Sequence, residues 1–131
     1  MASKIKTHLM FEGVAEEAMN FYVSLFANSA VQHVVKYGPG EHGAEGSIKI
    51  AAFTLAGRDF QCMDSPVKHG FTFTPSISLF VDCESEAELD EAFRRLSEGG
   101  GVLMPLNNYG FSKKFGWVND RFGPSWQLNL A

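Results

Sequence analysis

The sequence predicts an α+β protein built from two βαβββ modules, in each of which one helix covers one face of a four-stranded sheet. Short stretches rich in β-branched and aromatic residues alternate with two stretches of helical period. The order of these stretches repeats once, so that Ile5 in the first half corresponds to Ile77 in the second. The modules are expected at about residues 1–66 and 76–131, and the sheet faces that no helix covers are expected to form a shared cleft.

The first half begins with a strand and then changes to a helical period. A helix is expected over residues 14–27, because Glu16 and Glu17 suit the positive end of its dipole and four apolar side chains fall on one of its faces. These four are Ala18, Phe21, Tyr22 and Leu25. The strands of this half are expected at residues 4–12, 30–37, 47–56 and 58–64, with a Gly-rich surface loop at 38–46.

The second half repeats this order after a connector that lies between two prolines. Ser85 and Glu88 form a capping box that starts the second helix, in which each side chain is expected to accept from the other residue's backbone N–H. The glycines at 99–101 follow that helix and precede a strand, which is typical of a helix C-terminus and not of a phosphate loop. The buried helical stripe is expected to contain Leu89, Ala92, Phe93 and Leu96. The strands are expected at residues 76–82, 102–106, 113–119 and 125–130.

Composition argues against a nucleic-acid-binding or membrane-spanning protein. A chain of 131 residues can bury a core without disulfides or metal, and its formal net charge of −4 argues against nucleic-acid binding. No apolar run approaches the roughly 20 residues that a membrane helix needs. Cys62 and Cys83 lie in apolar, strand-like settings, which favours free buried thiols and a cytoplasmic location.

The last two strands carry the most informative pattern. Gln127 and Asn129 alternate with Trp126 and its apolar neighbours, so the final strand has one apolar and one polar face. A polar face that is buried needs hydrogen-bond partners, which indicates a cleft or a dimer seam. Trp126 is therefore expected under a helix, whereas Trp117 is a candidate for the wall of the cleft or dimer. Asp120 is expected to bond its own turn.

Ionisable residues show no local catalytic or metal motif. None of the four histidines has the spacing of a metal pair, and no Ser-His-Asp or Cys-His set can be assembled. Glu12, Asp64 and Asp82 are single carboxylates near strand ends. His8, on the first strand, is the histidine for which a functional role is considered.

Two segments resemble a known family. Gly13-Val14-Ala15-Glu16-Glu17-Ala18-Met19-Asn20-Phe21-Tyr22 and Gly116-Trp117-Val118-Asn119-Asp120-Arg121-Phe122-Gly123-Pro124-Ser125-Trp126-Gln127 resemble the PhnB-like branch of the vicinal oxygen chelate superfamily. This superfamily contains glyoxalase I, extradiol dioxygenases and the bleomycin- and fosfomycin-resistance proteins, and the branch is often labelled 3-demethylubiquinone-9 3-methyltransferase. The resemblance covers the whole chain and implies a single glyoxalase-like domain over residues 1–131 and a homodimer.

The resemblance also implies positions for a metal site, held by the first and fourth strands of each module. They fall on Gln61, Gln127, one of Ser76 and Ser78, and either Thr7 or His8, according to the register of the first strand. Neutral amide and hydroxyl oxygens are poor ligands for zinc or nickel, which prefer imidazole, thiolate and carboxylate. The methyltransferase label lacks support as well, because the chain has no Gly-rich strand-to-helix turn.

The sequence therefore predicts a cytoplasmic homodimer without metal or cofactor that binds a small organic molecule. Hydrogen bonds are expected from Thr7 or His8, Gln61, Ser76, Ser78 and Gln127, and an apolar wall from Phe80 and Trp117. The alternative is a lyase, isomerase or dioxygenase that uses His8 and Glu12 with a weakly bound or substrate-shared metal. A third reading is an interaction dimer whose cleft is filled.

Overall fold

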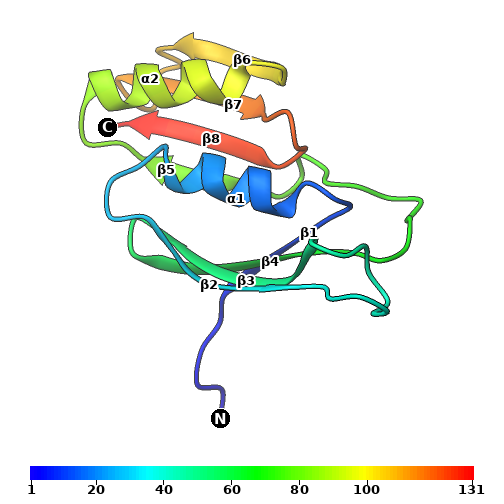
Figure 1. Cartoon of the computed structure of the whole chain (residues 1–131). Helices are drawn as coiled ribbons and strands as arrows, with labels where there is room; N and C mark the ends of the chain where they lie inside the picture. Colours follow the sequence, from blue (N-terminus) through cyan, green and yellow to red (C-terminus); the bar gives the residue numbers. More distant parts are fainter. The chain divides into compact units, whose positions relative to one another are not determined.

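The computed structural model describes all residues, 1–131, and confirms two βαβββ modules (Figure 1). The chain divides into two compact units, Met1–His69 and Gly70–Ala131, called module one and module two below. Each contains one mixed four-stranded sheet and one helix. None of the helices is long and apolar enough to cross a membrane.

Module one has the strand order β1-β4-β3-β2. β1 runs parallel to β4, and the other neighbouring strands are antiparallel. α1 packs against β2, β3 and β4 (Figure 1). The elements are β1 (Thr7–Phe11), α1 (Ala15–Val23), β2 (Ala30–Lys36), β3 (Ile48–Leu55) and β4 (Arg58–Asp64).

Module two repeats this topology with the order β5-β8-β7-β6. β5 runs parallel to β8, and α2 packs against β6, β7 and β8 (Figure 1). The elements are β5 (Leu79–Asp82), α2 (Glu86–Ser97), β6 (Gly101–Asn107), β7 (Lys114–Asn119) and β8 (Ser125–Leu130).

Every second side chain of each central strand is buried beneath the helix, as the period of two requires. In β4, Phe60, Cys62 and Asp64 are buried, whereas Gln61 and Met63 between them are half-buried. Burial and the nearby Asp64 carboxylate raise the pKa of Cys62 to about 12, so this thiol stays protonated at neutral pH.

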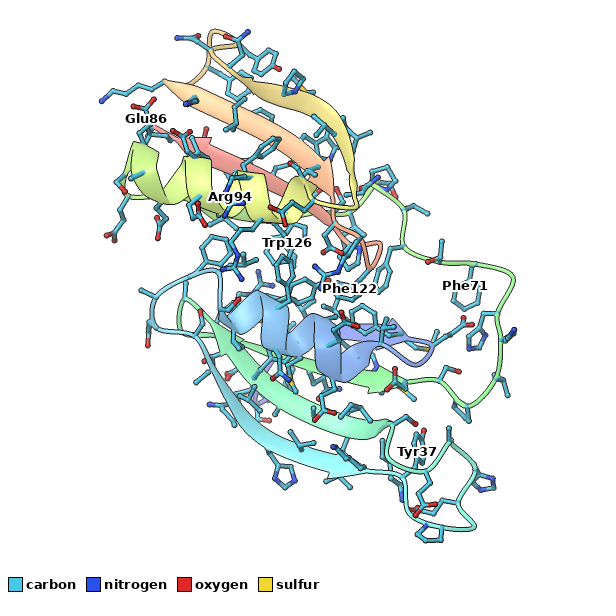
Figure 2. All side chains as sticks on the ribbon, turned by 45° about the horizontal axis from the view of Figure 1, so that its top comes forward. Tyr37, Phe71, Glu86, Arg94, Phe122 and Trp126 are labelled. Atoms are coloured by element: carbon cyan, nitrogen blue, oxygen red, sulfur yellow. The ribbon has the colours of Figure 1, made fainter.

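The predicted stripe of α2 is confirmed, since Leu89, Ala92, Phe93 and Leu96 are all buried. Beneath this helix, Gly116 in β7 leaves space for Phe93, because a Cβ at position 116 would lie 2.5 Å from Phe93 Cε2. Trp126, labelled in Figure 2, is 1 % exposed, and the strand register places its side chain on the α2 side of β8, as predicted.

The structure corrects three local predictions. α1 ends at Val23 and not near residue 27, because Ser24 and Leu25 donate to carbonyls only three residues back. In the capping box, Ser85 Oγ accepts from Glu88 N at 3.2 Å, but Glu88 Oε1 accepts from Glu84 N and not from Ser85 N.

The third correction concerns β5, which begins at Leu79 and not at residue 76. Ser76 Oγ lies 2.7 Å from Thr74 Oγ1, and Ile77 N bonds the Thr74 carbonyl at 3.5 Å. The chain therefore turns through these residues before it joins the sheet.

The buried Asp64 carboxylate joins three segments of module one. Its Oδ1 accepts from Gly13 N at 2.7 Å and from Ala15 N at 3.0 Å, and its Oδ2 accepts from Ile48 N at 2.9 Å. Because Ala15 is the first residue of α1, which has no side-chain cap of its own, Asp64 caps that helix from the end of β4. Tyr37, where the chain leaves β2, donates its hydroxyl to the Asp64 carbonyl at 3.2 Å (Figure 2). Asp64 thus has a structural role.

Replacing Asp64 by Asn is expected to lower the free energy of unfolding by about 1.5–3 kcal/mol. The three backbone N–H groups bond both carboxylate oxygens, whereas an amide has only one acceptor oxygen, so at least one N–H group loses its partner. Urea denaturation measures this change. The matched control is Asp59→Asn in the same strand, whose partner is Lys4 at 3.0 Å on the surface. This control should cost less than about 1 kcal/mol. Equal losses for both variants would refute the anchoring role of Asp64.

Candidate functional site

The face of the second sheet opposite α2 is the candidate site, and it is called the module-two face below. Phe80 lies directly opposite Gln127 in the sheet, and Gln127 lies directly opposite Trp117, so these side chains share one side of the sheet. Trp126 and Leu128 point to the other side and are buried. Alternation assigns to this face Phe80, Asp82, Phe115, Trp117, Asn119, Ser125, Gln127 and Asn129.

A hydrogen-bonded cluster occupies one part of this face, with Ser125 as its hub. Ser125 Oγ lies 2.7 Å from Ser78 Oγ and accepts from Trp117 Nε1 at 2.8 Å. Gln127 Nε2 donates to Ser78 Oγ at 3.2 Å. These four side chains, Ser78, Trp117, Ser125 and Gln127, are called the Ser125 cluster.

The bonds of the Ser125 cluster leave two polar groups for another molecule. The Ser78–Ser125 contact uses one of the two hydroxyl hydrogens, whichever serine donates. The second hydrogen remains free, and so does Gln127 Oε1, since the amide bonds Ser78 through its nitrogen. The cluster therefore presents one donor and one acceptor.

Aromatic rings surround Phe115 on the module-two face. Its ring centroid lies 6.2 Å from that of Phe80, 5.0 Å from Phe111 and 6.1 Å from Tyr109. Phe115 is buried, whereas Phe80 and Phe111 are 55 % and 62 % exposed. Large exposed apolar side chains next to aligned polar groups are typical of a surface that binds another molecule.

The turn between β7 and β8 holds the two tryptophans on opposite faces. Asp120 is buried, and its Oδ1 accepts from Phe122 N at 2.6 Å while its Oδ2 accepts from Trp126 Nε1 at 2.7 Å. This confirms the turn predicted for Asp120. Gly123 has a φ of 114°, which a residue with a side chain rarely adopts. Arg121 stacks on the Phe122 ring, with its Cζ 4.3 Å from the ring centroid.

In module one, the face opposite α1 contains His8 and Gln61. They are register partners, and His8 Nδ1 lies 2.7 Å from Gln61 Nε2. Thr7 lies on the other side of β1, where its hydroxyl accepts from Arg58 Nη2 at 3.0 Å. The register that the sequence left open therefore places His8, and not Thr7, beside Gln61.

The structure brings together only part of the predicted set. Ser78, Trp117 and Gln127 belong to one cluster, and Phe80 is the register partner of Gln127. Ser76 is exposed in the turn before β5 and bonds Thr74 instead.

His8 and Glu12 are not adjacent. They lie four positions apart in largely extended chain, or about 13 Å. Glu12 Oε2 instead accepts from His69 N at 3.3 Å.

Sequence reasoning missed Ser125, the hub of the cluster. Its position two residues before Gln127 places both side chains on one face of a strand, and this was the available signal.

The module-two face also contains a carboxylate, that of Asp82. Its Oδ1 accepts from Asn129 Nδ2 at 3.0 Å.

The side chains at the metal positions that the resemblance implies do not fit a divalent ion. The register pair His8–Gln61 of module one corresponds to Phe80–Gln127 of module two, since each pair joins the first strand of a module to the fourth. Phe80, and not Ser76 or Ser78 as expected from the sequence, therefore occupies this position of β5. One imidazole, two neutral amides and a phenyl ring are a poor donor set for zinc or nickel. No group of three His, Cys, Asp or Glu side chains placed to hold a metal occurs in the structure.

Both helix N-termini are capped by side chains. In α1 the Asp64 carboxylate accepts from Ala15 N. In α2 the Ser85 hydroxyl accepts from Glu88 N.

Comparison with known proteins gives one family over nearly the whole chain. The family model described as 3-demethylubiquinone-9 3-methyltransferase matches residues 3–129. The PhnB protein from Bacillus cereus is 56 % identical, with a TM-score of 0.96 over 98 % of this chain and 100 % of that one. Protein PA1353 from Pseudomonas aeruginosa is 25 % identical, with a TM-score of 0.84 and 98 % of both chains covered.

A more distant structure has the same fold. The fosfomycin resistance protein FosX from Listeria monocytogenes is 14 % identical, with a TM-score of 0.61 over 100 % of this chain and 94 % of that one. At this identity the likeness concerns the fold alone. A search of curated proteins gave no match.

Replacing Ser125 by Ala is expected to lower the free energy of unfolding by about 1–3 kcal/mol, because Trp117 Nε1 and Ser78 Oγ both lose a partner in a part-buried setting. Urea denaturation followed by circular dichroism measures this loss. Ser76→Ala removes an exposed hydroxyl outside the cluster and should stay within about 0.5 kcal/mol of wild type. If Ser125→Ala were as stable as this control, the cluster would not be a preorganised unit.

Proposed function

Because the chain belongs to the PhnB-like 3-demethylubiquinone-9 3-methyltransferase family, whose fold FosX shares, we propose that it binds a small organic molecule on the module-two face. The Ser125 cluster supports this proposal most strongly. It offers one hydroxyl hydrogen and the Gln127 Oε1 acceptor at fixed positions in a part-buried setting. Groups held in place before binding cost less entropy when a ligand arrives.

The ligand rests on aromatic rings beside these polar groups. Phe80 is the register partner of Gln127 and is largely exposed, and the Trp117 ring is half-buried on the other side of Gln127. A ring or other flat apolar part of the ligand lies against Phe80 or Trp117 while its polar group bonds Gln127 and the serines. This pairing of apolar walls with a few convergent polar groups is the usual composition of small-molecule sites.

Binding, and not a metal-assisted reaction, is the function that these residues support. The donor set at the metal positions fits no divalent ion. His8 and Gln61 are not part of the Ser125 cluster, and their contact with the ligand stays a prediction from the sequence. They belong to module one, whereas the cluster belongs to module two.

Native mass spectrometry of the protein after incubation with a small-molecule cell extract tests the proposal. Wild type should retain a discrete adduct, and Gln127→Leu and Ser78→Ala should each weaken its retention about tenfold, as expected for one lost hydrogen bond. The matched control is Gln32→Leu, at an exposed position of β2 in module one, which should retain the adduct fully. No adduct on wild type, or full retention by Gln127→Leu, would contradict the proposal.

The same proposal includes self-association through module two. β6 forms one edge of its sheet, and Val102 and Leu103 on it are 50 % and 42 % exposed. Pro105 in this strand has no N–H, which disfavours backbone pairing with a further strand, so a contact through side chains is proposed. A second copy of the chain that covers these apolar side chains would remove them from water.

Light scattering during size-exclusion chromatography tests this part. Wild type should have twice the chain mass of 14.4 kDa, and the double variant Val102→Lys, Leu103→Lys should have the mass of one chain. Val67→Lys, at an exposed apolar position of module one, serves as the control and should leave the dimer intact. A monomeric wild type, or a dimeric double variant, would contradict association through β6.

A further inference from the structure

Soft donor atoms gather on the face of module one opposite α1. Met10 in β1 and Met63 in β4 are register partners, and His8 lies two residues before Met10 on the same side of β1. Leu9, Phe11 and Cys62 point to the other side and are buried, whereas Met10 and Met63 are half-buried and His8 is exposed. Two thioethers and one imidazole therefore share a surface of adjacent strands.

Gln61 orients the imidazole. His8 Nδ1 lies 2.7 Å from the Gln61 amide nitrogen, and rotation of the amide by half a turn presents its oxygen at the same place. In that arrangement Nδ1–H donates to Gln61 Oε1, and Nε2 keeps a free lone pair. Fixing one ring nitrogen through a hydrogen bond while the other binds an ion is how proteins orient histidine ligands.

The chemistry of these donors selects the ion. Thioether sulfur is a soft ligand that favours Cu(I) and binds hard divalent cations poorly. Asp59, the carboxylate on the same side of β4, already pairs with Lys4 at 3.0 Å. Methionine side chains have three rotatable bonds, so two of them on paired strands can converge on one ion.

We propose that this face binds one Cu(I) ion through Met10 Sδ, Met63 Sδ and His8 Nε2, with Gln61 as the positioning residue for the imidazole. The site lies in module one and requires sulfur donors, which the proposed small-molecule site on module two does not contain. It also differs from a site for a hard divalent metal ion, which the two methionine sulfurs would not coordinate.

The competing explanation is that Met10 and Met63 only provide apolar surface. Met→Leu separates the two cases, because it keeps nearly the same volume and apolar character while it removes the sulfur. Cys62 and Cys83 are the other soft donors. Both are buried, and burial raises the pKa of each thiol to about 12, so neither is a thiolate at neutral pH.

The test is anaerobic competition for Cu(I) against the chelator bicinchoninate, with the full chain. Wild type should withdraw about one Cu(I) per chain, with sulfur and nitrogen neighbours in the X-ray absorption spectrum. Met10→Leu and Met63→Leu should each weaken binding at least tenfold. Gln61→Leu should weaken it about 10- to 100-fold through the imidazole.

Two controls make the result specific. Met104→Leu, at a half-buried methionine of β6, and the double variant Cys62→Ala, Cys83→Ala should bind Cu(I) as wild type does. Circular dichroism confirms that each variant is folded. No withdrawal of Cu(I) by wild type, wild-type affinity in Met10→Leu and Met63→Leu, or loss of binding only in the cysteine variant would each overturn the proposal.

Discussion

One helix can cover only one face of a sheet, and this constraint determines what each strand residue does in both modules. Successive side chains of a strand point to opposite faces, so each central strand places one set of side chains beneath α1 or α2 and the other set on the opposite face. β7 and β8 show the consequence most clearly. Trp126 is buried under α2, while Trp117 lies on the uncovered face with Gln127. Stability and the proposed binding thus depend on alternate residues of the same strands.

Two buried aspartates hold this arrangement, one in each module. Asp64 accepts three backbone N–H groups from the loop before α1, the first residue of α1 and the start of β3. Asp120 accepts from the backbone of its own turn and from the Trp126 indole. Both carboxylates are occupied by the fold, and this is the physical reason to assign them no catalytic part. A buried carboxylate near a strand end resembles a catalytic residue in sequence, and only its partners distinguish the two.

The sequence predicted local features well and long-range pairings poorly. Period and capping signals identified both helices and all eight strands, because these signals are carried by residues close together in the chain. The choice between Thr7 and His8 depended on the pairing of β1 with β4, about fifty residues away, so periodicity alone did not decide it. Ser125 was predicted only as the first residue of a strand, and its role as a hub emerges when Ser78 and Trp117 are placed beside it. The prediction that Ser76 lies at the site was wrong for a similar reason. Ser76 bonds Thr74 in a turn, and β5 begins only after this turn.

In the proposed binding mode, the face of module two opposite α2, and not the core of the module, contacts the ligand. The two tryptophans report on these two faces separately. Their indole N–H resonances can be followed by ¹H–¹⁵N NMR while a small-molecule cell extract is added to the labelled protein. We expect the Trp117 resonance to shift, and the resonance of Trp126, whose indole N–H donates to Asp120 in the core, to stay in place. A Trp117 resonance that does not move, or a shift confined to Trp126, would contradict this binding mode.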